Sequence, residues 1–113
     1  MRILVVGAGP VGLMFCAQLS KSGHECILVE RNSLRHTLSR ASSLQPASLE
    51  CLREFDFLPN LIAQGQRIEE IMSWDLDHDQ INICSYDLIR DQTLYPFRLH
   101  VNQSILRDEL IRF

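Results

Sequence analysis

Residues 3–30 carry the feature that most constrains what this chain can fold into. Residues 3–6 form an apolar, largely β-branched run, and the glycine-rich segment 7–12 follows it directly. A segment with helical character then extends to Ser22, and a second apolar run, 26–29, ends at Glu30. The first run is apolar at every position, as in strands of a parallel sheet that is covered on both faces. This order predicts a strand, a turn, a helix and a second, parallel strand.

The glycine-rich segment has the spacing of a phosphate-binding turn. Gly7 allows a sharp turn after the strand, Gly9 allows the main chain to approach a pyrophosphate, and Gly12 allows the helix to pack closely on the strand. The pattern GxGxxG is weak evidence by itself, but here it follows an apolar run and opens a helix. We therefore interpret the segment as a site for the pyrophosphate of a dinucleotide.

The start of the helix and the end of the second run support this interpretation. A helix N-terminus offers free N–H groups and a positive dipole end to phosphates, and Pro10 is preorganised for the first helical turn. Glu30 follows Gly12 at close to the spacing of about 20 residues expected for a carboxylate that binds a ribose 2′-OH. The alternative is a glycine-rich turn that binds nothing. We predict an α/β fold built on a Rossmann-type unit that binds FAD or NAD(P).

Length and composition restrict the other possibilities. The chain has 113 residues and a net charge of −3, which suits one small domain or a piece of a larger one and gives no case for nucleic acid as a partner. Residues 3–19 are uncharged, but their glycines, Pro10 and their short length argue against a signal peptide or a membrane span. The cysteines form no CxxC pair, which favours buried thiols in the cytoplasm over disulfides or metal ligands; they are Cys16, Cys26, Cys51 and Cys84.

The rest of the chain predicts short elements. Residues 31–43 are polar and basic and suggest a loop, and apolar residues recur with helical spacing between Pro46 and Phe55. Pro59 opens a helical turn that ends at Gly65, and Asn102 is a suitable N-cap for a last helix. Leu106, Leu110 and Phe113 should lie on one face of that last helix.

Residues 67–74 and 81–88 predict two strands joined by a hairpin turn. The turn holds three aspartates and a histidine, which could suggest a metal site. Aspartate is common in turns and no second cluster of ligands accompanies this one, so we interpret it as a hydrated turn and expect no metal.

Taken together, the motifs resemble the N-terminal region of a known family. Residues 7–13, 29–31, 40–41, 45–52 and 102–103 occur in the order found in the single-component FAD-dependent aromatic hydroxylases, the group typified by para-hydroxybenzoate and phenol hydroxylases. The similarity covers almost the whole chain and is strongest over residues 3–52 and 95–110.

The resemblance implies that FAD is the cofactor and suggests which residues bind it. The glycines would form the pyrophosphate turn and Glu30 would bind the adenosine ribose. Arg40 matches an arginine that reaches the FAD phosphates, Gln103 a cofactor-facing helix start, and Arg107 a position near the phosphates or, alternatively, a solvated charge. The expected cofactor-binding residues are Gly7, Gly9, Pro10, Val11, Gly12, Glu30, Arg31, Arg40, Gln103 and Arg107. No catalytic side chain is assigned.

The family fold implies three segments. Residues 1–66 would form the Rossmann-type unit, residues 67–101 a partial β excursion of the substrate domain, and residues 102–113 the start of a cofactor-facing helix. Family members are several hundred residues long, and two later cofactor motifs of the family are absent from this sequence. We therefore expect a fragment that lacks the remainder of the enzyme, and that is inactive and marginally stable by itself.

The predicted function is the FAD-binding portion of a flavoprotein monooxygenase. By resemblance, NAD(P)H would be the transient reductant, oxygen the co-substrate and a small aromatic compound the substrate, with no membrane partner. Two alternatives stay open. One is a fragment of another FAD- or NAD-dependent oxidoreductase, and the other is a non-catalytic remnant that binds nucleotide.

Overall fold

The computed structural model of the chain describes residues 2–32 and 42–113. The chain divides into two compact units, one formed by Met1–Ala41 with Asn102–Phe113 and the other by Ser42–Val101. The segment boundary that the sequence predicts at residues 66 and 67 therefore falls inside the second unit.

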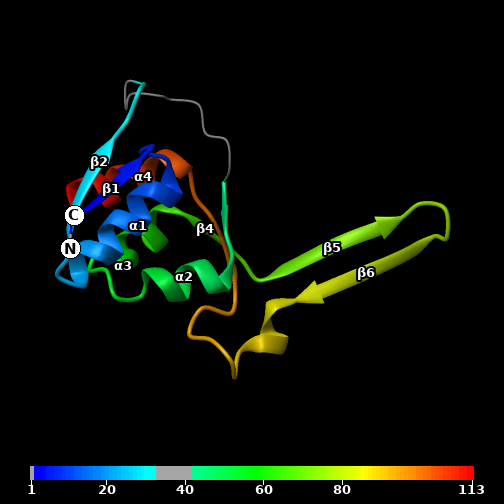
Figure 1. The fold of residues 1–113 in the computed structure, drawn as a ribbon. Helices are drawn as coiled ribbons and strands as arrows, with labels where there is room; N and C mark the ends of the chain where they lie inside the picture. The colour runs from blue at the N-terminus through cyan, green and yellow to red at the C-terminus, as the bar shows by residue number, and fades with distance from the viewer. Residues whose placement is uncertain (1, 33–41) are drawn as a thin grey trace. The chain divides into compact units, whose positions relative to one another are not determined.

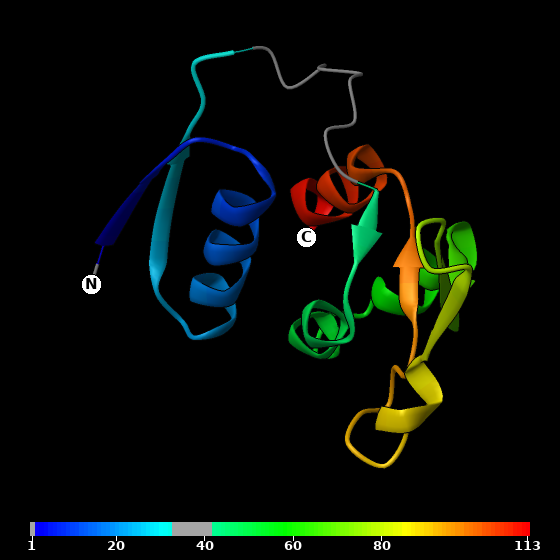
Figure 2. The ribbon, with the colours of Figure 1, turned by 90° about the vertical axis from the view of Figure 1, so that its right-hand side faces the viewer.

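The first unit is built on a strand–helix–strand motif. Strands β1 (Arg2–Val6) and β2 (Glu25–Val29) pair in parallel, with Val6 opposite Val29. Helix α1 (Pro10–Lys21) connects them and packs on one face of the pair (Figures 1 and 2). The predicted α/β unit is thus confirmed, with element bounds within one or two residues of the prediction.

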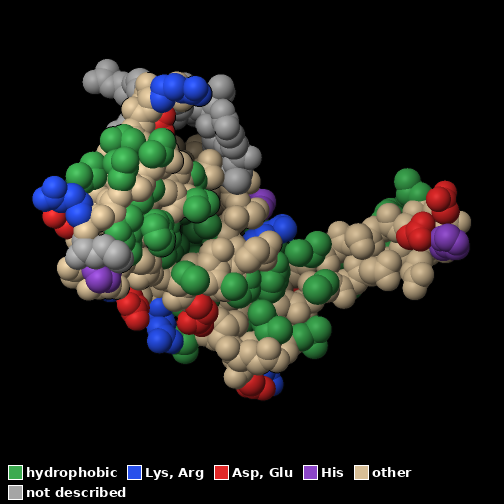
Figure 3. Space-filling view, in the orientation of Figure 1, with side chains coloured by type: hydrophobic (Ala, Val, Ile, Leu, Met, Phe, Trp, Pro, Cys, Tyr) green, Lys and Arg blue, Asp and Glu red, His purple; other side chains and the backbone are tan. Residues whose placement is uncertain are grey.

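The other face of this strand pair is exposed and apolar. Side chains at alternate positions of a strand point to opposite faces, so Leu4 and Val6 lie beside Ile27 and Val29 on the face that α1 leaves open. Each of these four residues is well exposed. Figure 3 shows hydrophobic side chains gathered over β1 and β2.

Helix α1 buries a narrow apolar stripe. Leu13 and Ala17 are buried, whereas Val11 and Phe15 are exposed. The helix ends at Lys21, close to the predicted Ser22, and the following Gly23 has a φ of 76° and donates its N–H to the carbonyl of Ser20.

Helix α4 (Gln103–Arg112) completes the first unit and packs against α1. The predicted cap is confirmed, because Asn102 Oδ1 accepts hydrogen bonds of 2.9 Å from the backbone N–H and the hydroxyl of Ser104. Leu106 and Leu110 are buried on α4. Phe113 follows the helix as its C-cap and is exposed.

The second unit contains a small antiparallel sheet. Its strands β3 (Ser43–Leu44), β4 (Gln66–Ile68) and β7 (Arg98–His100) are arranged in the order β3-β7-β4. Helices α2 (Pro46–Leu52) and α3 (Leu58–Gln64) precede β4 in the sequence. The largest fully buried side chains come from these helices, the turn between them and β7; they are Leu49, Phe55, Leu61 and Leu99.

A hairpin of β5 (Glu70–Asp75) and β6 (Gln80–Ser85) extends from this sheet. The predicted hairpin is confirmed, but two of its details are wrong. Residues 67–74 are divided between β4 and β5, which belong to different sheets. Tyr86–Ile89 form the 3₁₀ helix η1 instead of continuing the strand, and the Ser85 hydroxyl accepts the Asp87 N–H at its start.

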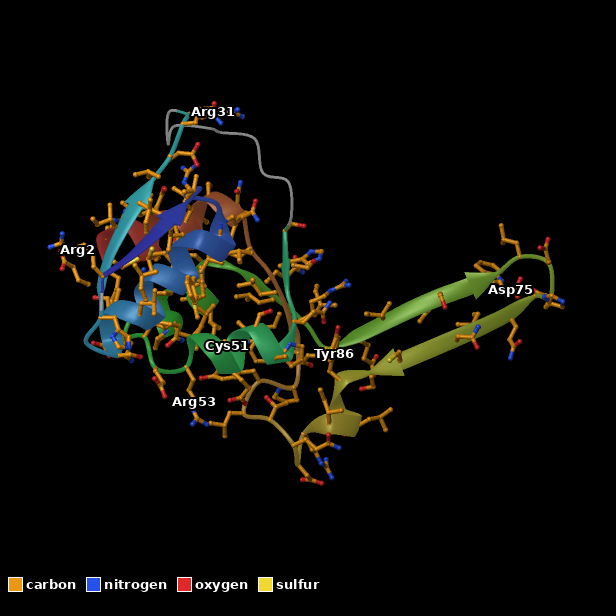
Figure 4. All side chains as sticks on the ribbon, viewed as in Figure 1. Arg2, Arg31, Cys51, Arg53, Asp75 and Tyr86 are labelled. Carbon is orange, nitrogen blue, oxygen red and sulfur yellow. The ribbon has the colours of Figure 1, made fainter. Side chains whose placement is uncertain are left out.

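The acidic turn of the hairpin is held by its own side chains. Asp75 Oδ2 lies 2.9 Å from His78 Nδ1, and Asp75 Oδ1 accepts the Asp77 N–H at 3.0 Å. Figure 4 shows Asp75 at the far end of the hairpin and Tyr86 at its base. No three His, Cys, Asp or Glu side chains gather as a metal site in the described part of the chain.

Two further observations concern predictions about the environment. Cys16 and Cys26 are half-buried, but Cys51 and Cys84 are exposed, so the prediction of buried thiols is wrong for the last two.

Within residues 2–32 and 42–113, no helix combines the length and the hydropathy that crossing a bilayer requires.

Candidate functional site

The turn between β1 and α1 has the geometry that the glycine spacing predicts. Gly7 has a φ of 108°, in the region that side chains with a Cβ atom rarely adopt, and its N–H donates to the Val29 carbonyl at 2.7 Å. This bond extends the pairing of β1 and β2 by one residue. The chain then reverses direction into α1.

Gly12 brings the helix against this turn. A Cβ atom at Gly12 would overlap the carbonyl oxygen of Gly7, so any larger residue would force α1 away from the turn. The same atom would also contact the Val5 side chain. Glycine is therefore required here by contacts within the protein.

Gly9 is in the opposite situation. It is the N-cap of α1, its backbone is extended, with φ −72° and ψ 173°, and a Cβ atom built on it would meet no protein atom within 4 Å. The space beside Gly9 is open. Contacts within the described protein do not require glycine at this position, and the open space leaves room for a ligand.

The first turn of α1 leaves N–H groups without helical partners. The Leu13 N–H donates to the Gly9 carbonyl at 2.9 Å and is the first donor of the helical ladder. Val11 and Gly12 precede it in the helix, so their N–H groups have no carbonyl four residues earlier within the helix, and Pro10 has no N–H. Together with the helix dipole, these donors create a positive end next to the open space at Gly9.

Glu30 lies beside this turn. Because β1 and β2 are parallel and in register, the residues that follow both strands meet at the same edge of the sheet. Glu30 Oε2 accepts the Ala8 N–H at 2.8 Å, and Oε1 accepts the Asn32 N–H at 2.7 Å. These hydrogen bonds, the one from Asn32 first, hold the pKa of the Glu30 carboxyl below its ordinary value.

Both carboxylate oxygens retain a second acceptor position. An ionised carboxylate has about four lone-pair sites, and the two backbone donors occupy only some of them. Glu30 is exposed, so a ligand hydroxyl can reach it. The structure thus brings a charged acceptor and a set of backbone donors to the two sides of one turn.

The remaining predicted residues lie in three places. Arg31 is exposed just beyond the end of β2, as Figure 4 shows. Gln103 and Arg107 are half-buried on α4, and the Arg107 guanidinium donates to Asp108 Oδ1 through Nε at 3.2 Å and Nη2 at 3.1 Å. Arg40 lies outside the described residues.

The sequence did not reveal two contacts of this unit. One is the hydrogen bond between Ala8 and Glu30, which the parallel register of the two runs could have indicated. The other is the contact between Cys16 and Cys26, whose sulfur atoms lie 2.7 Å apart. No sequence signal predicts this second contact, because the two cysteines are not in a CxxC pattern.

Comparison with known proteins identifies a family. The model of a family described as FAD binding domain matches residues 1–102. The chain is 27% identical to 6-methylpretetramide 4-monooxygenase of Streptomyces rimosus, over 98% of this chain and 20% of that protein. It is 28% identical to pentachlorophenol 4-monooxygenase of Sphingobium chlorophenolicum, over 96% of this chain and 20% of that protein.

A solved structure shows the same fold. The chain superposes on p-nitrophenol 4-monooxygenase from Pseudomonas putida with a TM-score of 0.84 and 22% identity, covering 97% of this chain and 28% of that one. The chain thus spans about a fifth of the length of the two relatives compared here and somewhat more than a quarter of this structure.

Proposed function

The chain belongs to the family of FAD binding domains, and on that premise we propose that it is the FAD-binding part of a monooxygenase that hydroxylates a small aromatic compound. NAD(P)H would be the reductant and oxygen the co-substrate. The observation that carries the proposal is the position of the Glu30 carboxylate, which accepts the Ala8 N–H inside the glycine-rich turn.

The residues present fit the cofactor. The open space beside Gly9 and the N–H groups of Val11 and Gly12 suit a pyrophosphate, which needs close backbone approach and several donors. The exposed, ionised Glu30 suits a ribose hydroxyl, to which it would be an acceptor. FAD, when bound, supplies the redox chemistry, and the protein orients it.

The basic and polar residues are proposed to complete the site. Arg31, Arg40 and Arg107 would neutralise the diphosphate charge, since hydrogen bonds between guanidinium and phosphate are strong and can be bidentate. Gln103, at the first position of α4, would donate or accept at the cofactor. The similarity of this chain to monooxygenases supports this assignment.

The hairpin β5–β6 is proposed to be the first part of the substrate domain. Met72 pairs with Ile83 and Trp74 with Ile81, so all four side chains lie on one face of the hairpin, and all four are exposed. A two-stranded hairpin is marginally stable by itself, and an apolar face of this kind favours packing against further structure.

The chemistry favours the cytoplasm as the location. All four cysteines are thiols in the structure, which suits a reducing compartment. NAD(P)H, the proposed reductant, is also present in the cytoplasm.

A titration with FAD tests the proposal directly. Purified chain is titrated with FAD and, separately, with NADH, with flavin fluorescence and calorimetric heat as readouts. We expect saturable binding of FAD that Gly9→Val abolishes and that Glu30→Gln and Arg40→Ala each weaken about tenfold, or about 1.4 kcal/mol. Glu25→Gln is the matched control, because Glu25 is the first residue of β2, away from the turn, where it pairs with Arg2.

The outcomes separate the proposed roles. If only Gly9→Val loses FAD binding, the turn binds FAD and the proposed roles of Arg40 and Glu30 are wrong. Binding of NADH in preference to FAD would contradict the cofactor assignment. We expect no consumption of NAD(P)H by the FAD-loaded chain, and consumption coupled to hydroxylation of a phenol would show that these residues suffice for the activity.

A further inference from the structure

Two cysteines of the first unit lie with their sulfur atoms in contact. Cys16 is on α1 and Cys26 on β2, and their Sγ atoms are 2.7 Å apart, with one thiol donating to the other sulfur. A disulfide bond is about 2.05 Å long, so the two atoms need to approach by less than about 1 Å to become bonded. Helix and strand already hold the pair together.

A small reagent can reach both sulfur atoms. Cys16 and Cys26 are half-buried and line an open cavity of about 310 Å³ in the first unit, together with Ser20 and His24. The cavity is large enough for water and for a peroxide. The pair therefore differs from a buried structural contact, which oxidants reach only after unfolding.

We propose that Cys16 and Cys26 form a redox-modification site, at which a hydroperoxide converts the two thiols to a reversible disulfide. One thiolate attacks a peroxide oxygen, the O–O bond breaks, and a sulfenic acid and water (for hydrogen peroxide) form. The second thiol, as its thiolate, attacks the sulfenic sulfur, the S–O bond breaks, and a second water leaves. The sulfurs lose two electrons to the peroxide, and their two protons end in water.

The environment of Cys16 disfavours its thiolate at neutral pH. Burial first, and then the hydrogen bond with Cys26, raises the pKa of the Cys16 thiol to about 11. Since the thiolate is the reacting species, alkaline pH raises the reactive fraction of Cys16. The oxidation experiment is therefore made at mildly alkaline pH.

The crosslink would fix the two elements that carry the candidate site. Cys16 is one helical turn after Gly12, and Cys26 is in the strand that leads to Glu30. A bond between them ties α1 to β2 and restricts the unfolded chain. The formation of the disulfide does not depend on FAD binding, so its test is independent of the proposed function.

Peptide mapping identifies the bond unambiguously. Trypsin cleaves after Lys21, which separates Cys16 from Cys26, and the arginines along the chain place Cys51 and Cys84 in two other peptides. The folded chain is treated with hydrogen peroxide at pH 8.5, digested without reductant and analysed by mass spectrometry. We expect peptides 3–21 and 22–31 to be joined, with the loss of two hydrogen atoms, and to separate after reduction.

The matched control removes the two exposed cysteines. The variant C51S/C84S should form the same linked peptide in the same yield, whereas C16S/C51S/C84S should form none and should retain one modifiable thiol. Linkages scattered among all four cysteines, or sulfinic acid at Cys16 or Cys26 without a linked peptide, would overturn the proposal. As a second measurement, oxidised C51S/C84S should unfold at a higher urea concentration than its reduced form, and an unchanged midpoint would contradict the locking of α1 to β2.

Discussion

The carboxylate of Glu30 accepts a 2.8 Å hydrogen bond from the backbone N–H of Ala8, twenty-two residues earlier in the chain. Ala8 lies in the glycine-rich turn, so the acid at the end of β2 is tied to the turn at the end of β1. The hydrogen bond thus orients the carboxylate before a ligand binds. The two halves of the candidate site are thus joined in the chain without any ligand.

This hydrogen bond makes the stability of the first unit depend on pH in the acid range. The folded-state pKa of Glu30 is lowered by the N–H groups of Asn32 and Ala8, so its contribution is fully present above the unfolded pKa of about 4.3. The contribution is lost as the pH falls through the lower folded-state pKa. We expect urea midpoints of wild type and Glu30→Gln to differ at pH 6 and to converge as the pH falls through that lowered folded-state pKa.

The control for this prediction is Glu25→Gln, which changes a carboxylate at the start of β2 without touching the turn. A carbon-detected NMR titration of the Glu30 carboxyl measures its pKa independently. A difference between wild type and Glu30→Gln that persists undiminished in acid would show that the carboxylate charge is not the cause.

The glycines of the turn should separate folding from binding. Gly12→Ala places a Cβ atom against the Gly7 carbonyl, and we expect a loss of about 1–3 kcal/mol in the free energy of unfolding. Gly9→Ala meets no protein atom and has a normal φ, so its stability should stay within about 0.5 kcal/mol of wild type. The FAD affinity of Gly9→Ala should nevertheless fall at least about tenfold, which corresponds to about 1.4 kcal/mol in the free energy of binding.

Chemical denaturation and FAD titration of the two variants check this pair. Equal destabilisation by both substitutions would mean that the turn is not open at Gly9. An unchanged FAD affinity in Gly9→Ala would show that the pyrophosphate does not closely approach the backbone at Gly9.

The sequence predicted the local elements well because their signals are local. The apolar runs, the glycine spacing and the Asn102 cap specify β1, α1, β2 and the start of α4 through contacts within a few residues. The same logic placed Leu49, Leu52 and Phe55 on a buried face of the segment after Pro46, although α2 itself ends at Leu52.

The errors of prediction come from contacts between distant residues. Strands of two or three residues, such as Ser43–Leu44 and Arg98–His100, have no periodic pattern and form by pairing with segments that are distant in the sequence. The end of β6 was missed because Ser85 starts a 3₁₀ helix through its own hydroxyl group. The partner of Glu30 depends on the register of two strands, which sequence spacing alone does not give.

The Asn102 cap contributes measurably to α4. Its Oδ1 atom accepts the Ser104 N–H at 2.9 Å, and Asn102→Ala would leave that donor without its partner. We expect a loss of about 1 kcal/mol in the free energy of unfolding. Asn102→Asp should restore most of it, because aspartate caps equally well, and failure of this rescue would assign the loss to a cause other than capping. Denaturant unfolding of the three proteins provides the measurement.

The two faces of β1 should respond differently to the same substitution. Val5 faces α1, as its distance of 3.5 Å from a Cβ atom built on Gly12 shows, whereas Val6 is 79% exposed on the opposite face. Valine and threonine have nearly the same shape, so the change tests only the added hydroxyl group. We expect Val5→Thr to cost about 1 kcal/mol, because it places a hydroxyl group at a half-buried position against α1, and Val6→Thr to cost about 0.5 kcal/mol or less.

The same pair tests the consequence of the exposed apolar face. Parallel sheets are normally covered on both sides, and an exposed apolar sheet face favours association. Val6→Thr should therefore lower the self-association of the chain in sedimentation velocity and its binding of a hydrophobic dye, while Val5→Thr should not lower either one. Reduced self-association in both variants would indicate that the substitutions act through a change in the packing of the whole unit and not through the exposed face. Unchanged association in Val6→Thr would mean that this face does not drive it, even though four apolar side chains are open to solvent there.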